Sequence, residues 1–306
     1  MPAPARPVPP YLARLDAVRQ ALAAVEADAL IVTHPANLRY LTGFDGSMGA
    51  ALVTRTGCTL IVDGRYFTTA QERAAAPQLG DLRVELAPRS LEEGIAASWS
   101  RTAPPVVGVE GAVMTLERFA RLQGLIPARF VTTERTVERG RMIKDDGEIE
   151  VMREAARMLS SAAVDALAAV RPGRSEAEVA FDVELALRRA GFSKPAFETI
   201  VASGSNSALP HARPGSRVLS PGDGVVLDFG GVYDGYCVDL TRTVQLGPAS
   251  GSFTRIFEAV RAAHAAAIAT IRPGIAAGAV DAAARGAGRA GAGRSVRSRH
   301  GTWSGP

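Results

Sequence analysis

Cysteine is scarce in this chain, and long apolar runs are absent. Only Cys58 and Cys237 occur among the 306 residues, which argues against a disulfide framework and against a cysteine zinc site. The first residues, MPAPARPVPPYLARLD, contain no apolar stretch of the signal-peptide type. The run AAHAAAIATI is too short and too weakly apolar to span a bilayer. We therefore expect a cytoplasmic protein without a membrane partner.

Acidic residues are missing from the last part of the sequence. Residues 282–306 contain no Asp or Glu but do contain five arginines: Arg285, Arg289, Arg294, Arg297 and Arg299. Removing these five from the 35 basic residues leaves 30, against 31 acidic residues. The formal charge of +4 therefore belongs to the tail, and the nearly neutral body does not predict nucleic acid as a partner.

Helix and strand patterns alternate in the first part of the chain. Five apolar residues recur at helical spacing: Leu12, Leu15, Val18, Leu22 and Val25. The runs typical of strands are ALIVT (29–33), AALVT (50–54), TLIVD (59–63), VVGVEG (106–111) and RFVTTE (129–134). A further helix is predicted around LERFARL, residues 116–122. These patterns predict an N-terminal α/β domain over residues 1–138.

A charged connector then leads into a second domain, residues 139–306. A long helix is predicted there, with Ile149, Met152, Ala156 and Leu159 on one face. Two segments resemble each other, DALAAVRPGRSEAEV (165–179) and AAIATIRPGIAAGAV (266–280). Each reads as a helix, an Arg-Pro-Gly turn and a second helix, and Ser175 with Glu178 forms a capping box. The pair indicates a pseudo-symmetric domain, although Arg-Pro-Gly is also a common helix-ending turn.

The segment VVLDFGGVYDGYCVDLTRT, residues 225–243, places Asp228 and Asp239 on two apolar runs. Burying an ionised carboxylate is unfavourable unless a cation or hydrogen-bond donors compensate it. Two such carboxylates on neighbouring strands predict a metal site. The alternative is that one aspartate caps the turn and the other faces solvent on an amphipathic strand.

Several motifs in order resemble the family of Xaa-Pro dipeptidases (prolidases) and aminopeptidases P. The longest is ASGSNSALPHARPGSRVLSPGDGVVLDFGGVYDGYCVDLTRTV, residues 202–244. Upstream, HPANLRYLTGF, IVDGRYFTTA and MIKDDGEIEVMREAA resemble the N-terminal domain and connector of that family. The resemblance covers residues 10–284.

This resemblance implies a creatinase/prolidase-type α/β N-terminal domain followed by an α+β pita-bread domain that is incomplete in its C-terminal half. It implies hydrolysis of the bond between an N-terminal residue and proline, with proline-containing peptides as substrates and a homodimer as the assembly. It also implies two divalent ions of manganese, cobalt or zinc, held by two aspartates, a histidine and two glutamates. Asp228 and Asp239 match the two aspartates, and His211 matches a histidine of the substrate site.

The family's TGHGLGL-like motif and its two later glutamates are not readable here, so we expect weak metal binding and little hydrolysis. One back-translation of SRHGTWSGP (298–306), read one nucleotide on, encodes Arg-Gly-Thr-Gly-His-Gly-Leu-Gly-Leu. We therefore hypothesise a frameshift between Asp281 and Ser295 and a non-native tail over residues 285–306 of a truncated chain. The alternative is a native disordered arm that binds RNA or acidic surfaces. Resequencing the gene distinguishes the two.

Three classes of function stay open at this point. The first is an Xaa-Pro metallopeptidase, the second a creatinase-like hydrolase without the metal ligands, and the third a binding or dimerisation module. Metal-dependent turnover of an Xaa-Pro dipeptide distinguishes the first class from the third. We also expect exposed apolar surface and poor solubility, because strands of the second domain would lack partners.

Overall fold

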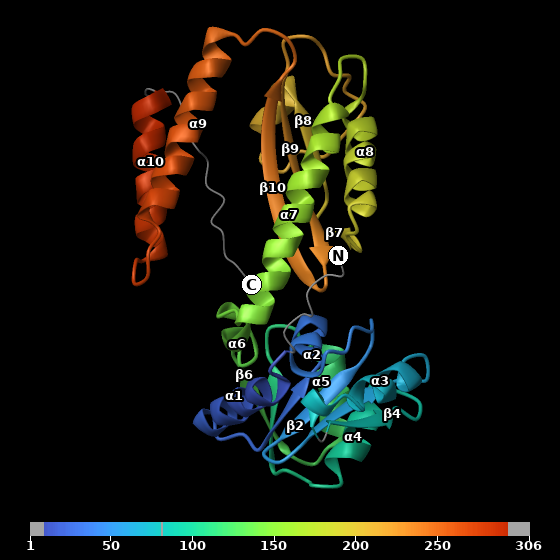
Figure 1. Cartoon of the computed structure of the whole chain (residues 1–306). Helices are drawn as coiled ribbons and strands as arrows, with labels where there is room; N and C mark the ends of the chain where they lie inside the picture. The colour runs from blue at the N-terminus through green and yellow to red at the C-terminus, as the bar shows by residue number, and fades with distance from the viewer. Residues whose placement is uncertain (1–8, 81, 293–306) are drawn as a thin grey trace. The chain divides into compact units, whose positions relative to one another are not determined.

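The computed structural model describes residues 9–80 and 82–292 (Figure 1). Its contacts divide the chain into two units. The first unit comprises residues up to Glu154 together with Asp234–Tyr236, and the second comprises Ala155–Tyr233 and the residues from Cys237 onward. The domain boundary near residue 138 stays a prediction. The alternate-frame stretch, residues 298–306, lies outside the described residues, so the frameshift also stays a prediction.

A six-stranded sheet organises the first unit. Its strands are β1 (Ala29–Val32), β2 (Ala50–Thr54), β3 (Cys58–Val62), β4 (Leu82–Leu86), β5 (Val106–Glu110) and β6 (Arg129–Thr133). They lie in the order β4-β3-β2-β1-β5-β6. β2 is antiparallel to β1 and to β3, whereas the pairs β1–β5, β5–β6 and β3–β4 are parallel. The five predicted strands are confirmed, and β4 is an additional strand.

The central strand β1 is buried on both faces of this sheet. Leu30 and Val32 pack in one apolar core, whereas Ala29 and Ile31 pack in the other. Side chains alternate between the faces of a strand, so an uninterrupted apolar run such as this one requires a cover on each side. The sheet is therefore the middle layer of a three-layer α/β unit, as the sequence predicts.

Helices provide both covers. They are α1 (Tyr11–Ala24), α2 (Pro35–Thr42), α3 (Phe67–Ala74), α4 (Leu91–Trp99), α5 (Leu116–Leu125) and α6 (Glu138–Met142), with a short 3₁₀ helix η1 (Pro77–Leu79). Helices α1, α2 and α3 contribute to the first core, and α4 and α5 to the second. Two predicted members of the α1 apolar face, Leu12 and Val25, are exposed. The buried face starts instead at Tyr11, because Tyr11, Leu15, Val18 and Leu22 share one side of the helix.

The second unit packs helices on one face of a four-stranded sheet. Its elements are α7 (Asp146–Ala168), which begins in the first unit, α8 (Glu176–Arg189), β7 (Lys194–Pro195), β8 (Ile200–Ser203), η2 (Gly204–Ala208), β9 (Gly224–Tyr233), β10 (Tyr236–Gln245), α9 (Gly251–Thr270) and α10 (Ala277–Ala292). The sheet order is β10-β9-β7, and β8 pairs with β9. One member of the predicted α7 face is wrong. Ala156 is exposed, whereas its neighbour Ala155 is buried together with Leu159.

Both Arg-Pro-Gly sequences join two helices, as predicted. Gly173 between α7 and α8 has φ +88°, and Gly274 between α9 and α10 has φ +83°. Glycine adopts this left-handed conformation without the strain that a Cβ atom brings. The capping box at α8 is confirmed, since the Ser175 hydroxyl accepts a hydrogen bond from the Glu178 amide and the Glu178 carboxylate accepts one from the Ser175 amide.

Helices α9 and α10 pack against each other (Figure 1). Within α9 only Ala259 is buried, and several large apolar side chains are at least 42% exposed: Ile256, Phe257, Val260 and Ile268. This agrees with the expected exposure of apolar surface in the second domain. Across residues 9–80 and 82–292, no helix has both the length and the apolar character needed to cross a bilayer.

Candidate metal centre

The hairpin of β9 and β10 sets the positions of the two candidate aspartates. Asp234 and Gly235 form its turn, with φ values of +46° and +76°. A two-residue turn with both φ values positive is of type I′, whose twist matches the twist of the flanking strands. This turn length places Asp228 opposite Thr241, and the Thr241 hydroxyl donates a hydrogen bond of 2.7 Å to an Asp228 carboxylate oxygen.

Asp228 and Asp239 therefore lie on the same face of the hairpin as diagonal neighbours. The opposite face of β9 forms the core, where Leu227 and Phe229 are completely buried. Asp228 is half-buried and Asp239 is exposed. The interpretation of two buried carboxylates is wrong in this respect, because both apolar runs are amphipathic strands. β9 buries its odd-numbered side chains, whereas β10 packs its even-numbered ones, such as Val238 and Leu240, against the core.

Ionisation of Asp239 is made less favourable by its surroundings. The pKa of Asp239 is raised, first because the surrounding sheet removes part of its hydration. Charge repulsion by Asp228 and a hydrogen bond between the two carboxyl groups raise it further. In the described part of the chain, neither aspartate forms an ion pair with Lys or Arg. The pair is thus a concentration of negative charge that a cation would relieve.

This donor set fits part of a divalent metal site. Two carboxylates on one face suit the oxygen preference of manganese and are also accepted by cobalt and zinc. Among the described residues, no group of three or more His, Cys, Asp and Glu side chains is arranged to hold a metal ion. Asp228 and Asp239 are two of the five ligands that the family resemblance implies, and their role in metal binding stays a prediction.

His211 lies in the turn that follows η2, on the connection between β8 and β9. Its side chain is exposed. The connection starts beside the aspartate strand, because Ser203 at the end of β8 pairs with Val225 of β9, three residues before Asp228. The proposed role of His211 at the substrate stays a prediction.

A buried carboxylate in this unit was missed at the level of sequence. Glu176, the first residue of α8, is 1% exposed and accepts hydrogen bonds from Ser203, Asn206 and Gly215. Acidic residues are frequent in the first turn of helices, where they interact favourably with the helix dipole. The position of Glu176 in the first turn of a helix therefore explains the presence of an acid here without indicating its burial.

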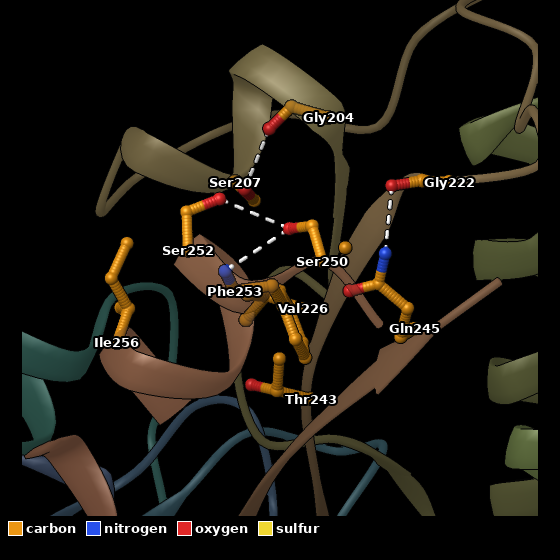
Figure 2. A pocket seen from close by; sticks show the side chains of 11 residues that line it. Gly204, Ser207, Gly222, Val226, Thr243, Gln245, Ser250, Ser252, Phe253 and Ile256 are labelled. Atoms are coloured by element: carbon orange, nitrogen blue, oxygen red, sulfur yellow. Dashed lines mark hydrogen bonds between the residues drawn. The ribbon is translucent and has the colours of Figure 1, made fainter. Parts of the chain in front are cut away.

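A pocket of about 270 Å³ opens on the same side of the hairpin, between β9, β10 and the start of α9 (Figure 2). Val226 and Thr243, which occupy the next cross-strand position after Asp228 and Thr241, contribute to its wall. Figure 2 also shows the Ser250 hydroxyl accepting a hydrogen bond from the Phe253 amide at the start of α9. The lining does not include His211, Asp228 or Asp239, so the pocket adjoins the candidate centre without containing its polar groups.

Comparison with known proteins gives the family. Residues 150–305 match metallopeptidase family M24, and residues 14–143 match the creatinase/prolidase N-terminal domain. The chain is 34% identical over 263 residues to the peptidase YqhT of Bacillus subtilis, covering 86% of this chain and 73% of that protein. It is 30% identical over 259 residues to the Xaa-Pro dipeptidase of Pyrococcus horikoshii, covering 84% of this chain and 71% of the relative.

Solved structures give the same result. The Xaa-Pro dipeptidase from Bacillus anthracis aligns with a TM-score of 0.86 and 30% identity, covering 90% of this chain and 77% of that structure. The prolidase from Pyrococcus horikoshii aligns with a TM-score of 0.82 and 26% identity, covering 92% and 78%. These similarities confirm the predicted fold class. The chain belongs to metallopeptidase family M24 and has a creatinase/prolidase N-terminal domain ahead of its M24 domain.

Proposed function

We propose that this chain is a metal-dependent hydrolase of the bond between an N-terminal residue and proline. The observation that carries the proposal is the Asp228–Asp239 pair, two carboxylates on one face of a hairpin with mutual repulsion. Support for the substrate class comes from relatives named Xaa-Pro dipeptidase. Proline-containing peptides are accordingly the proposed substrates.

Four residues of the chain have separate roles in the proposed reaction. Asp228 and Asp239 hold divalent metal, and the Thr241 hydroxyl orients Asp228 through its hydrogen bond. A divalent ion of manganese, cobalt or zinc supplies a Lewis acid that polarises the scissile carbonyl and activates water. His211 lines the substrate site and stabilises the reacting group. The homodimer and the cytoplasmic location stay predictions.

Two other functions compete with this one. A creatinase-like hydrolase does not need the two aspartates, so their pairing on one face disfavours that function. A binding or dimerisation module would keep the fold without turnover. The described residues contribute two carboxylates to the site, and we therefore expect weak metal binding and slow hydrolysis.

The test is release of the N-terminal residue by the full chain after chelation and addition of Mn²⁺, Co²⁺ or Zn²⁺. We expect slow, metal-dependent release from an Xaa-Pro dipeptide or from a longer Xaa-Pro peptide, and the preferred length separates dipeptidase from aminopeptidase. Asp239→Asn should abolish the metal-dependent release, because it replaces one of the two negatively charged ligands with a neutral amide. Asp165→Asn, an exposed aspartate on α7, is the matched control and should leave release unchanged.

Two results would contradict the proposal. Release that proceeds equally in the presence of chelator would indicate hydrolysis without metal. Release that is absent with all three ions, combined with a folded protein, would favour the binding module.

A further inference from the structure

Glu176 is a carboxylate with a position that a helix-capping role does not explain. Its side chain is 1% exposed, and both of its oxygens accept hydrogen bonds. The capping box at the same helix end uses Ser175 and Glu178 instead. Burial of a carboxylate is unfavourable unless its oxygens are satisfied, so this arrangement needs a separate explanation.

The hydrogen bonds of Glu176 go to both ends of one segment. Oxygen Oε1 accepts from the Ser203 amide at 2.8 Å and from the Ser203 hydroxyl at 2.7 Å. Oxygen Oε2 accepts from the Gly215 amide at 3.3 Å. The Asn206 side-chain amide donates to both oxygens at 3.1 Å. One carboxylate thus joins the end of β8 to Gly215, with residues 204–214 between the two anchors.

Backbone contacts strengthen the second anchor. The Glu176 amide donates to the Arg217 carbonyl at 3.0 Å, and the Ala177 amide donates to the Gly215 carbonyl at 3.0 Å. The Arg217 guanidinium also donates to the Ser203 hydroxyl, which is itself a donor to Glu176. The start of α8 therefore contacts the segment at both of its ends.

The negative charge of Glu176 suits a side chain that must accept hydrogen bonds from both ends of the segment. Its oxygens receive only donors, and a negative charge interacts favourably with the N-terminus of a helix. A glutamine would keep one acceptor oxygen but would direct an NH₂ group at one of the N–H donors. Only a carboxylate can accept at both anchors.

We propose that Glu176 is a positioning residue that holds residues 203–215, and with them His211, in place beside the aspartate strand; the part concerning His211 rests on the proposed function. The geometry supports this because His211 lies between the two anchors, and because the first anchor, at the end of β8, pairs with Val225 of β9, three residues before Asp228 on the same strand. Glu176 acts through the segment and does not itself contact substrate.

The experiment compares the wild-type chain with Glu176→Gln, Asn206→Ala and the control Glu178→Gln. Glu178→Gln removes a charge from the same helix end without touching Ser203 or Gly215. Amide hydrogen exchange is measured across the chain. We expect exchange within residues 204–215 to rise about tenfold in Glu176→Gln and less in Asn206→Ala, with no change there in Glu178→Gln.

A second measurement follows the imidazole NMR signal of His211, assigned with a His211→Gln variant. Mn²⁺ is the probe, because a bound paramagnetic ion broadens nearby signals. We expect Mn²⁺ to broaden the His211 signal in wild type and in Glu178→Gln, and to broaden it clearly less in Glu176→Gln. A purely structural contribution to α8 would leave this broadening unchanged.

The outcomes separate this inference from the proposed function. Unchanged exchange of residues 204–215 in Glu176→Gln, or a rise spread evenly over the second unit, would overturn the role of Glu176. If Mn²⁺ broadens no His211 signal in wild type, the proposed metal site fails, and hydrogen exchange alone decides whether Glu176 holds the segment. If Glu176→Gln does not fold, the milder Asn206→Ala decides.

Discussion

At the scale of single residues, the charges of the second unit differ in how they are neutralised. Asp228 and Asp239 repel each other, Glu176 is satisfied by neutral donors, and Asp223 is held by a cation. The Arg217 guanidinium donates to both Asp223 oxygens at 2.7 and 2.9 Å, and the Ser220 amide adds a third hydrogen bond. The last arrangement makes ionisation of the Asp223 carboxyl group a source of stability.

This difference leads to a pH prediction. The hydrogen bond from Arg217 is the largest cause that lowers the pKa of Asp223 below its usual 3.8. A lowered carboxyl pKa contributes stability that is present above the unfolded value and is lost as the pH falls through the folded value. We expect Asp223→Asn to reduce the free energy of unfolding by about 2 kcal/mol at neutral pH and by progressively less below about pH 4. Urea unfolding at several pH values measures this, and a difference independent of pH would contradict it.

At the scale of elements, the β9–β10 turn determines which side chains meet. Gly235 has φ +76°, so a Cβ atom at this position would strain the turn. We expect Gly235→Ala to lower the free energy of unfolding of the chain by about 1–2 kcal/mol. Gly286→Ala is the matched control, because Gly286 lies in α10 with open space around it and should be neutral or slightly stabilising. Thermal unfolding compares the two, and equal effects would refute the turn argument.

Element prediction from sequence succeeded where one physical signal dominated. The five apolar strand runs and the helix after Ser175 are found where the patterns place them. Strand β4 was missed because Arg83 and Glu85 alternate with its apolar residues, so this edge strand lacks the continuous apolar run that marks the central strands. The aspartate pair was found from the sequence, but its degree of burial was not, since a short apolar run does not reveal that only one face is covered. Glu176 was missed because its donors lie far away in the sequence, at residues 203–215.

At the scale of the whole molecule, α9 leaves apolar side chains in contact with water. Val260 is 63% exposed and Ile268 is 57% exposed. Contiguous exposed apolar surface favours association in solution. We expect the hydrodynamic radius of the chain to rise with concentration, and the double variant Val260→Lys and Ile268→Lys to weaken that rise.

Leu116→Lys provides the control for this prediction. Leu116 is 87% exposed but stands on α5 of the first unit, away from the α9 residues in sequence and in unit. Replacing this exposed leucine with lysine should leave association unaltered. Equal effects of the control and the double variant, measured by dynamic light scattering, would show that α9 is not responsible.

The anchoring of both ends by Glu176 also determines how far the length and sequence of residues 204–214 can change. Because the ends of residues 204–214 are fixed by one carboxylate, the closure entropy of the connection depends only on the logarithm of its length. Doubling that length would cost roughly 0.6 kcal/mol, which a stable domain tolerates. Apart from Asn206 and His211, residues between the anchors can thus be exchanged, added or removed while the anchors and the sheet stay the same. The connection is a place where evolution or a protein engineer can alter specificity without rebuilding the scaffold.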